Sequence, residues 1–155
     1  MKRLVMSVAA AAALLAMDVA GEALAQAKPA AAAPVTTGTV KLNIKPATGA
    51  AITSGDVAGG AKVFKQCASC HVVAAGQNRV GPSLHKLIGR KSGTAPGFKY
   101  SKANMSSGIT WTEQELFTYL ENPRAKIKGT TMAFVGLKDP KQRADVIAYI
   151  QANSK

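Results

Sequence analysis

The feature that most constrains this chain is the pentapeptide Cys67-Ala68-Ser69-Cys70-His71, which has the spacing C-x-x-C-H. If these residues are helical, the two thiols and the imidazole project from one face, because residues three and four apart are neighbours on a helix. They include the only two cysteines of the chain, so no second disulfide or thiolate site competes for them. We therefore expect one site that uses both thiols and the histidine.

The C-x-x-C-H pattern is typical of covalent haem attachment. Its two thiols can add to the two vinyl groups of one haem, and the adjacent imidazole can then bind the iron. A thioredoxin-like redox pair would need a βαβ context, which the sequence does not indicate. Zinc would need two further ligands, and the only other histidine is His85, which we interpret as a surface residue. The pattern favours haem c, with disulfide and zinc as alternatives.

The first 25 residues have the composition of a secretory signal peptide. Lys2 and Arg3 precede a largely apolar run over residues 4–17, and the A-L-A of residues 23–25 fits the small-residue cleavage pattern. The run is shorter than the roughly 20 apolar residues that span a bilayer, so we expect cleavage after this tripeptide. An uncleaved anchor is the alternative. Export agrees with the haem interpretation, because two thiols would stay reduced and free in the cytosol.

The formal net charge of +12 implies acidic partners. Nucleic acid is disfavoured because the basic residues are scattered, without interleaved aromatic residues, in a chain that we expect to be exported. The charge instead favours the acidic face of another protein, with at most peripheral contact to an anionic membrane.

Residues 26–54 are predicted to be an Ala/Pro-rich flexible linker or arm. An Ala/Pro tract at residues 30–34 is followed by recurring Thr, Gly and Pro, a composition that does not bury enough apolar surface to fold alone. Val40, Leu42 and Ile44 alternate with polar residues, which is a weak strand signal. We expect a short extended piece at most, and one ordered domain over residues 55–155 that begins near Asp56.

The first predicted helix follows Asp56, a plausible N-cap. Val57, Ala61 and Phe64 recur at helical spacing, and we expect this helix to run into the C-x-x-C-H. Gly60 costs helix stability, by about 1 kcal/mol relative to alanine. A close crossing with a second helix would explain it.

Two further helices are predicted in the second half. The sequence T-E-Q-E at residues 112–115 is a capping box, and the proline after Asn122 ends the helix that it opens. Asp139-Pro140 starts the last helix, whose buried stripe should contain residues 146, 149 and 150. Residues 72–97 are rich in glycine and proline and leave no room for a helix of ordinary length. The predicted fold class is all-α.

With these elements in order, the chain resembles class I cytochrome c, the monohaem family of mitochondria and the bacterial periplasm. The resemblance covers roughly residues 54–153 and rests on separated motifs in the family's order. After the C-x-x-C-H these are R-V-G-P-S-L at 79–84, G-R-K-S-G at 89–93, A-P-G-F at 95–98, Tyr100, Ala103-Asn104, Trp111, Y-L-E-N-P at 119–123, G-T-T-M-A-F at 129–134 and I-A-Y-I at 147–150. It implies a class I cytochrome c fold, in which three main helices, short helices and long loops wrap around one covalent haem.

The resemblance also implies a role for Met132. From the residues alone, this methionine is either a core residue that fills a gap or a ligand. By resemblance it is the second iron ligand, opposite His71. It also implies that Cys67 and Cys70 attach the haem and that the Pro82 carbonyl accepts the His71 Nδ1–H. The haem propionates would accept hydrogen bonds from Arg90, Tyr100, Trp111 and Thr130. Tyr119 would donate to the methionine sulfur, and Asn104 would lie beside a buried water near that sulfur. Gly60 and Phe64 match residues that meet Tyr149.

The function that the resemblance implies is a soluble periplasmic electron carrier, monomeric and without catalytic residues. Its donor would be a bc-type complex or a dehydrogenase, and its acceptor an oxidase or a photosynthetic reaction centre. The basic docking ring is altered, since Gln66, Ala125 and Thr131 stand where the family often has lysine. Two alternatives stay open: a redox subunit tethered to the membrane by an uncleaved N-terminus, and a haem that binds gas or peroxide because Met132 does not hold the iron.

Overall fold

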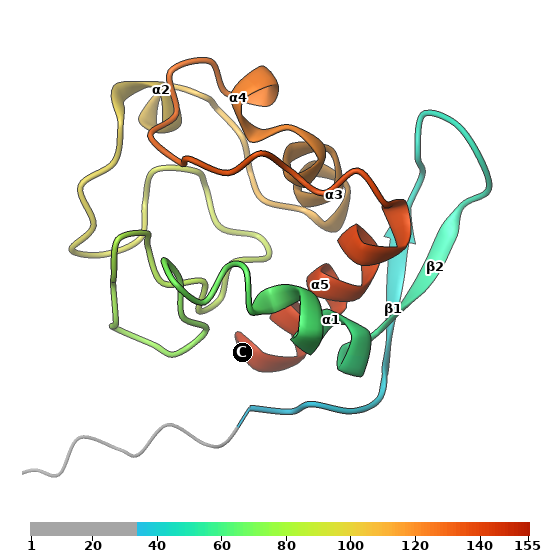
Figure 1. Cartoon of the computed structure of the whole chain (residues 1–155). Helices are drawn as coiled ribbons and strands as arrows, with labels where there is room; N and C mark the ends of the chain where they lie inside the picture. The colour runs from blue at the N-terminus through green and yellow to red at the C-terminus, as the bar shows by residue number, and fades with distance from the viewer. Residues whose placement is uncertain (1–33) are drawn as a thin grey trace, which may run out of the picture. The chain divides into compact units, whose positions relative to one another are not determined.

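The computed structural model describes residues 34–155, so the predicted signal peptide and the first residues of the predicted arm lie outside the described part. Helices account for most of the regular structure (Figure 1). In chain order the elements are β1 (Thr39–Ile44), β2 (Ile52–Asp56), α1 (Val57–Phe64), α2 (Lys102–Met105), α3 (Glu113–Glu121), α4 (Pro123–Lys126) and α5 (Pro140–Asn153). The three main helices of the prediction are α1, α3 and α5. None of the described helices has both the length and the apolar character needed to span a bilayer.

Side-chain caps start the three main helices where the sequence predicts them. Asp56 accepts hydrogen bonds from the amides of Ala58 and Gly59 at 3.2 and 2.8 Å, and so caps α1. Thr112 accepts from the Glu115 amide at 3.0 Å at the start of α3. Asp139 accepts from the amide of residue 141 at 2.8 Å and precedes Pro140 at the start of α5. These caps satisfy amides that have no partner inside the helix.

Helices α1 and α5 cross in close contact, as Gly60 suggested. A Cβ atom at Gly60 would lie 2.0 Å from the carbonyl oxygen of Asp145 and 2.7 Å from the Cβ of Tyr149. The rings of Phe64 and Tyr149 pack at the same crossing, with centroids 4.9 Å apart. The crossing places the C-terminal end of α1 beside α5, and the C-x-x-C-H follows directly in the chain.

The C-x-x-C-H itself lies after α1, which differs from the expectation that the helix would run into it. Helix α1 ends at Phe64. There the backbone hydrogen bonds span three residues instead of four, and the Cys67 amide donates to the Phe64 carbonyl at 2.8 Å. A single helical turn follows, in which the amide of His71 donates to the carbonyl of Cys67 at 2.8 Å. The i, i+4 spacing of Cys67 and His71 is therefore kept without a continuous helix.

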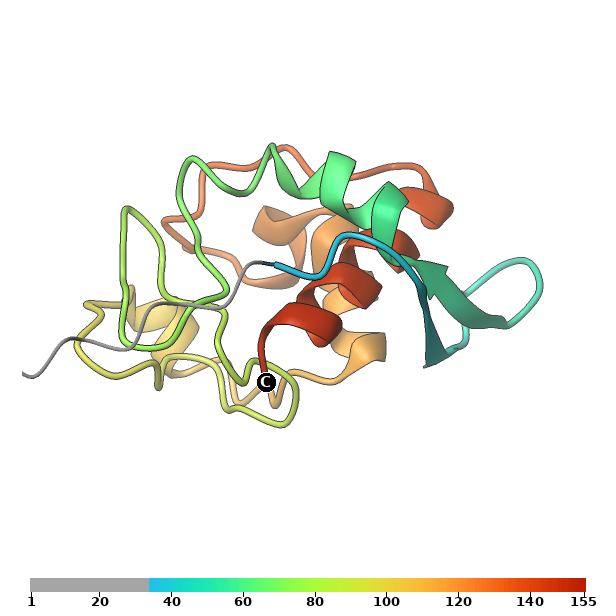
Figure 2. The same ribbon diagram turned by 90° about the horizontal axis from the view of Figure 1, so that it is seen from below.

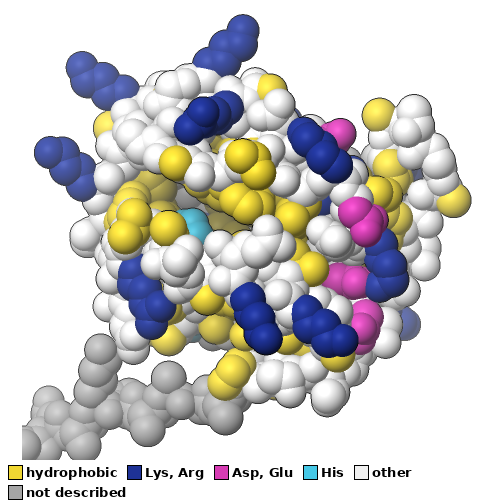
Figure 3. Space-filling view, viewed as in Figure 1, with side chains coloured by type: hydrophobic (Ala, Val, Ile, Leu, Met, Phe, Trp, Pro, Cys, Tyr) yellow, Lys and Arg dark blue, Asp and Glu magenta, His cyan; other side chains and the backbone are white. Residues whose placement is uncertain are grey.

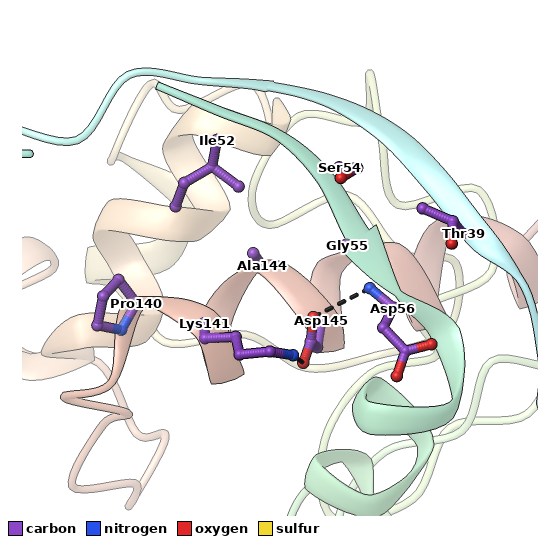
Figure 4. A pocket seen from close by; sticks show the side chains of 9 residues that line it. All are labelled: Thr39, Ile52, Ser54, Gly55, Asp56, Pro140, Lys141, Ala144 and Asp145. Carbon is purple, nitrogen blue, oxygen red and sulfur yellow. Dashed lines mark hydrogen bonds and ion pairs between the residues drawn. The ribbon is translucent and has the colours of Figure 1, made fainter. Parts of the chain in front are cut away.

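Strands β1 and β2 form an antiparallel hairpin, which corrects the expectation that order begins near Asp56. Leu42 and Ile44 of β1 are buried in the hydrophobic core, so the weak alternation marks a real strand. The hairpin packs on α5: the Asp56 amide donates to Asp145 Oδ1 at 3.0 Å, and a Cβ at Gly55 would lie 2.6 Å from the Ala144 carbonyl oxygen. Figure 4 shows β2 against α5, with an open pocket between them.

Because the hairpin covers it, α5 is buried on more than one side. Residues 143–150 are all buried, whereas the sequence predicted a single buried stripe. The loops of residues 72–101 lie on the side of the helices opposite the hairpin (Figures 1 and 2). No helix occurs between Phe64 and Lys102 in the described chain, as the glycine and proline content predicted. The hairpin and the loops thus occupy opposite sides of one helical frame.

Candidate functional site

All of the site residues predicted from the sequence line one cavity. Cys67, Cys70 and His71 contribute from the turn after α1, and Met132 from the segment before α5. The other predicted residues in its wall are Pro82, Arg90, Tyr100, Asn104, Trp111, Tyr119 and Thr130. Figure 3 shows a hollow on this face, with apolar side chains at its edge and lysines and arginines around it. His85 does not line the cavity.

The imidazole of His71 is held by the loop that follows it. Its Nδ1 lies 2.8 Å from the Pro82 carbonyl oxygen, the hydrogen bond that the resemblance implied. A Cβ atom at Gly81 would lie 2.3 Å from the ring, so glycine is needed there for the loop to approach. Burial lowers the pKa of His71, which the hydrogen bond to Pro82 partly opposes. An Nδ1–H that donates to a carbonyl leaves Nε2 unprotonated and able to bind a metal.

The thioether of Met132 is also held by hydrogen bonds. The Tyr119 hydroxyl donates to Met132 Sδ at 3.1 Å, as the resemblance implied. The Met132 amide donates to Thr130 Oγ1 at 3.2 Å, which fixes the backbone. Burial raises the pKa of Tyr119, although hydrogen bonds with Thr130 and Asn104 oppose the shift. The phenol is therefore protonated at neutral pH and can donate to the sulfur.

Both cysteines are free thiols, partly buried at the edge of the cavity. Burial raises the pKa of Cys67 to about 11, and the nearby Cys70 adds to the shift. The Cys67 thiol is consequently uncharged at neutral pH. No cluster of three or more histidine, cysteine or acidic side chains suited to a metal ion occurs in residues 34–155.

Arg90 brings a positive charge into the wall. Its two terminal nitrogens donate to the carbonyls of His85 and Ser83, each at 2.8 Å. Its Nε is buried and has no hydrogen-bond partner among the described residues. Burial lowers the pKa of Arg90, while the neighbouring Tyr100 opposes the shift. None of the described residues that line the cavity is acidic, so an anionic group of a bound molecule would find a cation and an unused N–H here.

Three other predicted residues surround this part of the cavity. The Tyr100 hydroxyl accepts a long hydrogen bond, 3.4 Å, from the Ala95 amide. Asn104 is buried and bonded to Ser101 at the start of α2. Trp111 packs edge-on against Tyr119, with ring centroids 4.9 Å apart. These contacts hold polar side chains beside an otherwise apolar wall.

The apolar wall of the cavity could not be recognised from the sequence. It is made of Leu84, Leu87, Leu116, Leu120, Val146 and Ile150. Their only signal was apolar character, partly at helical spacing, which is the same for a core position and for the wall of a cofactor site. Only the folded structure separates the two.

The donor set fits a haem. Two thiols, an imidazole and a thioether line the same cavity, and large aliphatic side chains form its walls. The unpartnered Nε of Arg90 meets the need of a buried carboxylate for a donor. A covalently bound, apolar ring with two acidic groups matches these features together.

Comparison with known proteins agrees with this chemistry. The family model "Cytochrome c" matches residues 57–154. Cytochrome c2 of Blastochloris viridis is 54% identical over 97 residues, which cover 62% of this chain and 76% of the relative. Cytochrome c type-1 of Ascaris suum is 52% identical over 101 residues, which cover 64% of this chain and 90% of the relative. The hairpin lies outside the residues matched by the family model.

Among solved structures, cytochrome cH from Methylobacterium extorquens is similar, with a TM-score of 0.58 and 41% identity. The match covers 61% of this chain and 95% of the other. The motif spacing, the cavity and these similarities agree with one another. The chain therefore belongs to the cytochrome c family, as a small electron-carrier cytochrome of class I that binds one haem c covalently.

Proposed function

We propose that this protein is a periplasmic carrier of single electrons, with haem attached at Cys67 and Cys70 and with His71 and Met132 as the two axial ligands. The observation that supports this proposal is that an imidazole and a thioether, each held by a hydrogen bond, line the same cavity as the two thiols. The bound haem supplies a one-electron iron couple. Because His71 and Met132 would both bind the iron, we propose no catalytic residue and no substrate at the iron.

The other polar residues would hold the haem and adjust its surroundings. Arg90, Tyr100, Trp111 and Thr130 are proposed as donors to the propionates, because a buried carboxylate needs such partners. Pro82 orients His71, and Tyr119 orients the sulfur of Met132. Asn104 is proposed to support the hydrogen bonding around Tyr119.

The charges favour docking through the face that contains the cavity. Lys65, Arg79 and Lys99 are exposed and each adjoins a residue that lines the cavity. Val80, also in the lining, has 80% of its surface exposed. Apolar contact surrounded by positive charge suits fast, short-lived encounters with an acidic partner.

We propose that the electron donor is a bc-type complex or a periplasmic dehydrogenase and that the acceptor is an oxidase or a photosynthetic reaction centre. Redox proteins with acidic faces fit the charge of this chain, and no other class of partner is needed. The carrier is proposed to act as a monomer. Its reactions with such partners should slow as salt is added, because screening weakens the attraction.

The axial ligands are tested by the optical spectrum. The ferric protein should show the methionine-to-iron charge-transfer band, and Met132→Ala should lose it and have a lower reduction potential. Met105→Ala is the matched control, because Met105 is 56% exposed and does not line the cavity. A wild-type protein without the band, or one that readily binds carbon monoxide when reduced, would overturn the carrier and favour a haem that binds gas or peroxide.

The periplasmic location rests on the predicted signal peptide. Cells should be fractionated and the N-terminus of the mature protein sequenced. A soluble periplasmic protein that begins at or near Gln26 would support the proposal. An intact N-terminus in the membrane fraction would instead support the tethered subunit.

A further inference from the structure

Arg143 is a buried arginine that the proposed electron transfer does not use. It lies on α5 with 5% of its surface exposed, and it does not line the haem cavity. Burying a charged side chain costs free energy unless it is well paired. The groups that pair with this guanidinium therefore indicate its role.

Residues 127–139, between α4 and α5, form the segment that carries Met132. The contacts of Arg143 lie at the C-terminal end of this Met132 segment. Its Nη1 donates to the carbonyl oxygens of Leu137 at 2.6 Å and of Lys138 at 3.1 Å. The guanidinium carbon lies 4.2 Å from the centroid of the Phe117 ring, and Nη2 lies 3.7 Å from the carboxylate of Glu121. One side chain thus joins α5, α3 and the segment between them.

The same end of the segment is fixed to α3. The Leu137 amide donates to the Leu120 carbonyl at 2.7 Å, and Lys138 Nζ donates to the Glu121 carbonyl at 2.9 Å. A Cβ atom at Gly136 would lie 2.1 Å from the Glu121 carbonyl oxygen, so the backbone approaches α3 closely there.

Between this point and Met132 the described segment lacks hydrogen bonds, although Phe134 packs against the hydrophobic core. Residues 133–136 make no hydrogen bond with another described residue, and Val135 has 85% of its surface exposed. On its C-terminal side, the first hydrogen bonds after Met132 in the described chain are therefore those at Leu137 and Lys138. On its N-terminal side the Met132 amide is bonded to Thr130.

We propose that Arg143 is a positioning residue for Met132: it fixes the C-terminal end of the Met132 segment between α3 and α5 and so keeps the thioether in the cavity. The proposal rests on the assignment of Met132 as an axial ligand. Without the guanidinium, two carbonyls lose a charged donor and the segment can swing away while the helices stay in place. The measurable result is easier displacement of the methionine by an added ligand.

The test compares Arg143→Met with Lys141→Met, a matched loss of one cation on the same helix. Lys141 bonds to Asp145 on the hairpin side and does not contact the Met132 segment. Imidazole is titrated into each ferric protein and the loss of the charge-transfer band is followed. Loss of a hydrogen bond to a charged group changes such an equilibrium about tenfold, so Arg143→Met should bind imidazole at least about tenfold more tightly than wild type. Lys141→Met should stay within about twofold, because it is not coupled to that segment.

Melting temperatures separate positioning from general stability. Equal gains in imidazole affinity in both variants, in step with their loss of melting temperature, would overturn the proposal. So would unchanged affinity in Arg143→Met. If Arg143→Met does not take up haem, Arg143→Lys is used instead. In that variant, hydrogen exchange of the Leu137 amide should become about tenfold faster while exchange in α1 is unchanged. Equal acceleration at both places would contradict the proposal. A wild-type protein without the charge-transfer band would disprove the ligand assignment itself, which is a separate result.

Discussion

The hydroxyl of Tyr119 lies 3.1 Å from the sulfur of Met132 and donates a hydrogen bond to it. This bond draws electron density from the sulfur and so makes the thioether a weaker donor. With Met132 as iron ligand, the bond favours the reduced state, because ferrous iron needs less donation than ferric iron.

We expect Tyr119→Phe to lower the reduction potential. A hydrogen bond of about 1 kcal/mol corresponds to roughly 40 mV for a one-electron couple, which sets the upper size of the effect. Redox titration measures it. Tyr149→Phe is the control, because Tyr149 is a buried tyrosine that does not line the cavity. A potential that rises in Tyr119→Phe, or falls equally in both variants, contradicts the expectation.

The crossing of α1 and α5 predicts that Gly60→Ala is destabilising. A Cβ there would lie 2.0 Å from a backbone oxygen of α5, so the helices must separate, at a cost of roughly 1–3 kcal/mol beyond any gain in helix propensity. At Gly59 the nearest atom is the side-chain oxygen of Asp145, at 2.6 Å, which can move. Denaturant unfolding of the ferric protein should therefore give a larger loss for Gly60→Ala than for Gly59→Ala. Equal losses would mean that the crossing can relax.

The hairpin should contribute to stability without affecting the haem site. Ile44 of β1 is 1% exposed, so Ile44→Ala should cost about 2–5 kcal/mol of unfolding free energy. Lys41→Ala, an exposed position on the same strand, should stay within about 0.5 kcal/mol. Both variants should keep the wild-type spectrum and potential. A changed potential in Ile44→Ala would show that the hairpin acts on the site.

The pair formed by Lys141 and Asp145 predicts a dependence on pH. The hydrogen bond and the charge of Asp145 raise the pKa of Lys141 in the folded state. A raised pKa means that the pair stabilises the fold fully below the unfolded lysine pKa of about 10.4 and that this contribution falls as pH rises further. The stability difference between wild type and Lys141→Met should be constant from pH 7 to about pH 10 and shrink above it. A difference that grows in alkali would contradict the assigned sign.

Charge near the cavity should control the rate of meeting an anionic reaction partner. Lys65→Glu and Lys41→Glu change the net charge equally, but only Lys65 adjoins the cavity lining. Oxidation of the ferrous protein by hexacyanoferrate(III) at low salt should slow about threefold to tenfold in Lys65→Glu and much less in Lys41→Glu. High salt should bring the rates together. Equal slowing at low salt would mean that net charge, and not its place, decides the rate.

The three main helices could be predicted because their signals are local. Asp56, Thr112 and Asp139 each accept from amides of the helix that they precede, so a few adjacent residues define each start. The candidate site could be predicted because the C-x-x-C-H spacing and the order of the later motifs can be read directly from the sequence. The roles proposed for individual haem contacts remain predictions.

The hairpin and the role proposed for Arg143 depend on contacts between residues that are distant in the sequence. The alternation over Val40, Leu42 and Ile44 is weak by itself, and β2 is held where Gly55 meets Ala144, far along the chain. A buried arginine and a solvated one look alike in a sequence. The end of α1 was also missed, because the tightened turn at Phe64 leaves no compositional mark.

The residues before β1 meet the last helix at Asn153, whose side chain donates to the carbonyl of Val35 at 2.9 Å and accepts from its amide at 2.5 Å. Residues 35 and 153 are therefore neighbours in space. A short peptide could join them, and the exposed turn between β1 and β2 could be opened to provide new chain ends. Such a circular permutant should fold around the same cavity although the order of its segments is changed. Both new chain ends would lie on the hairpin, away from the cavity.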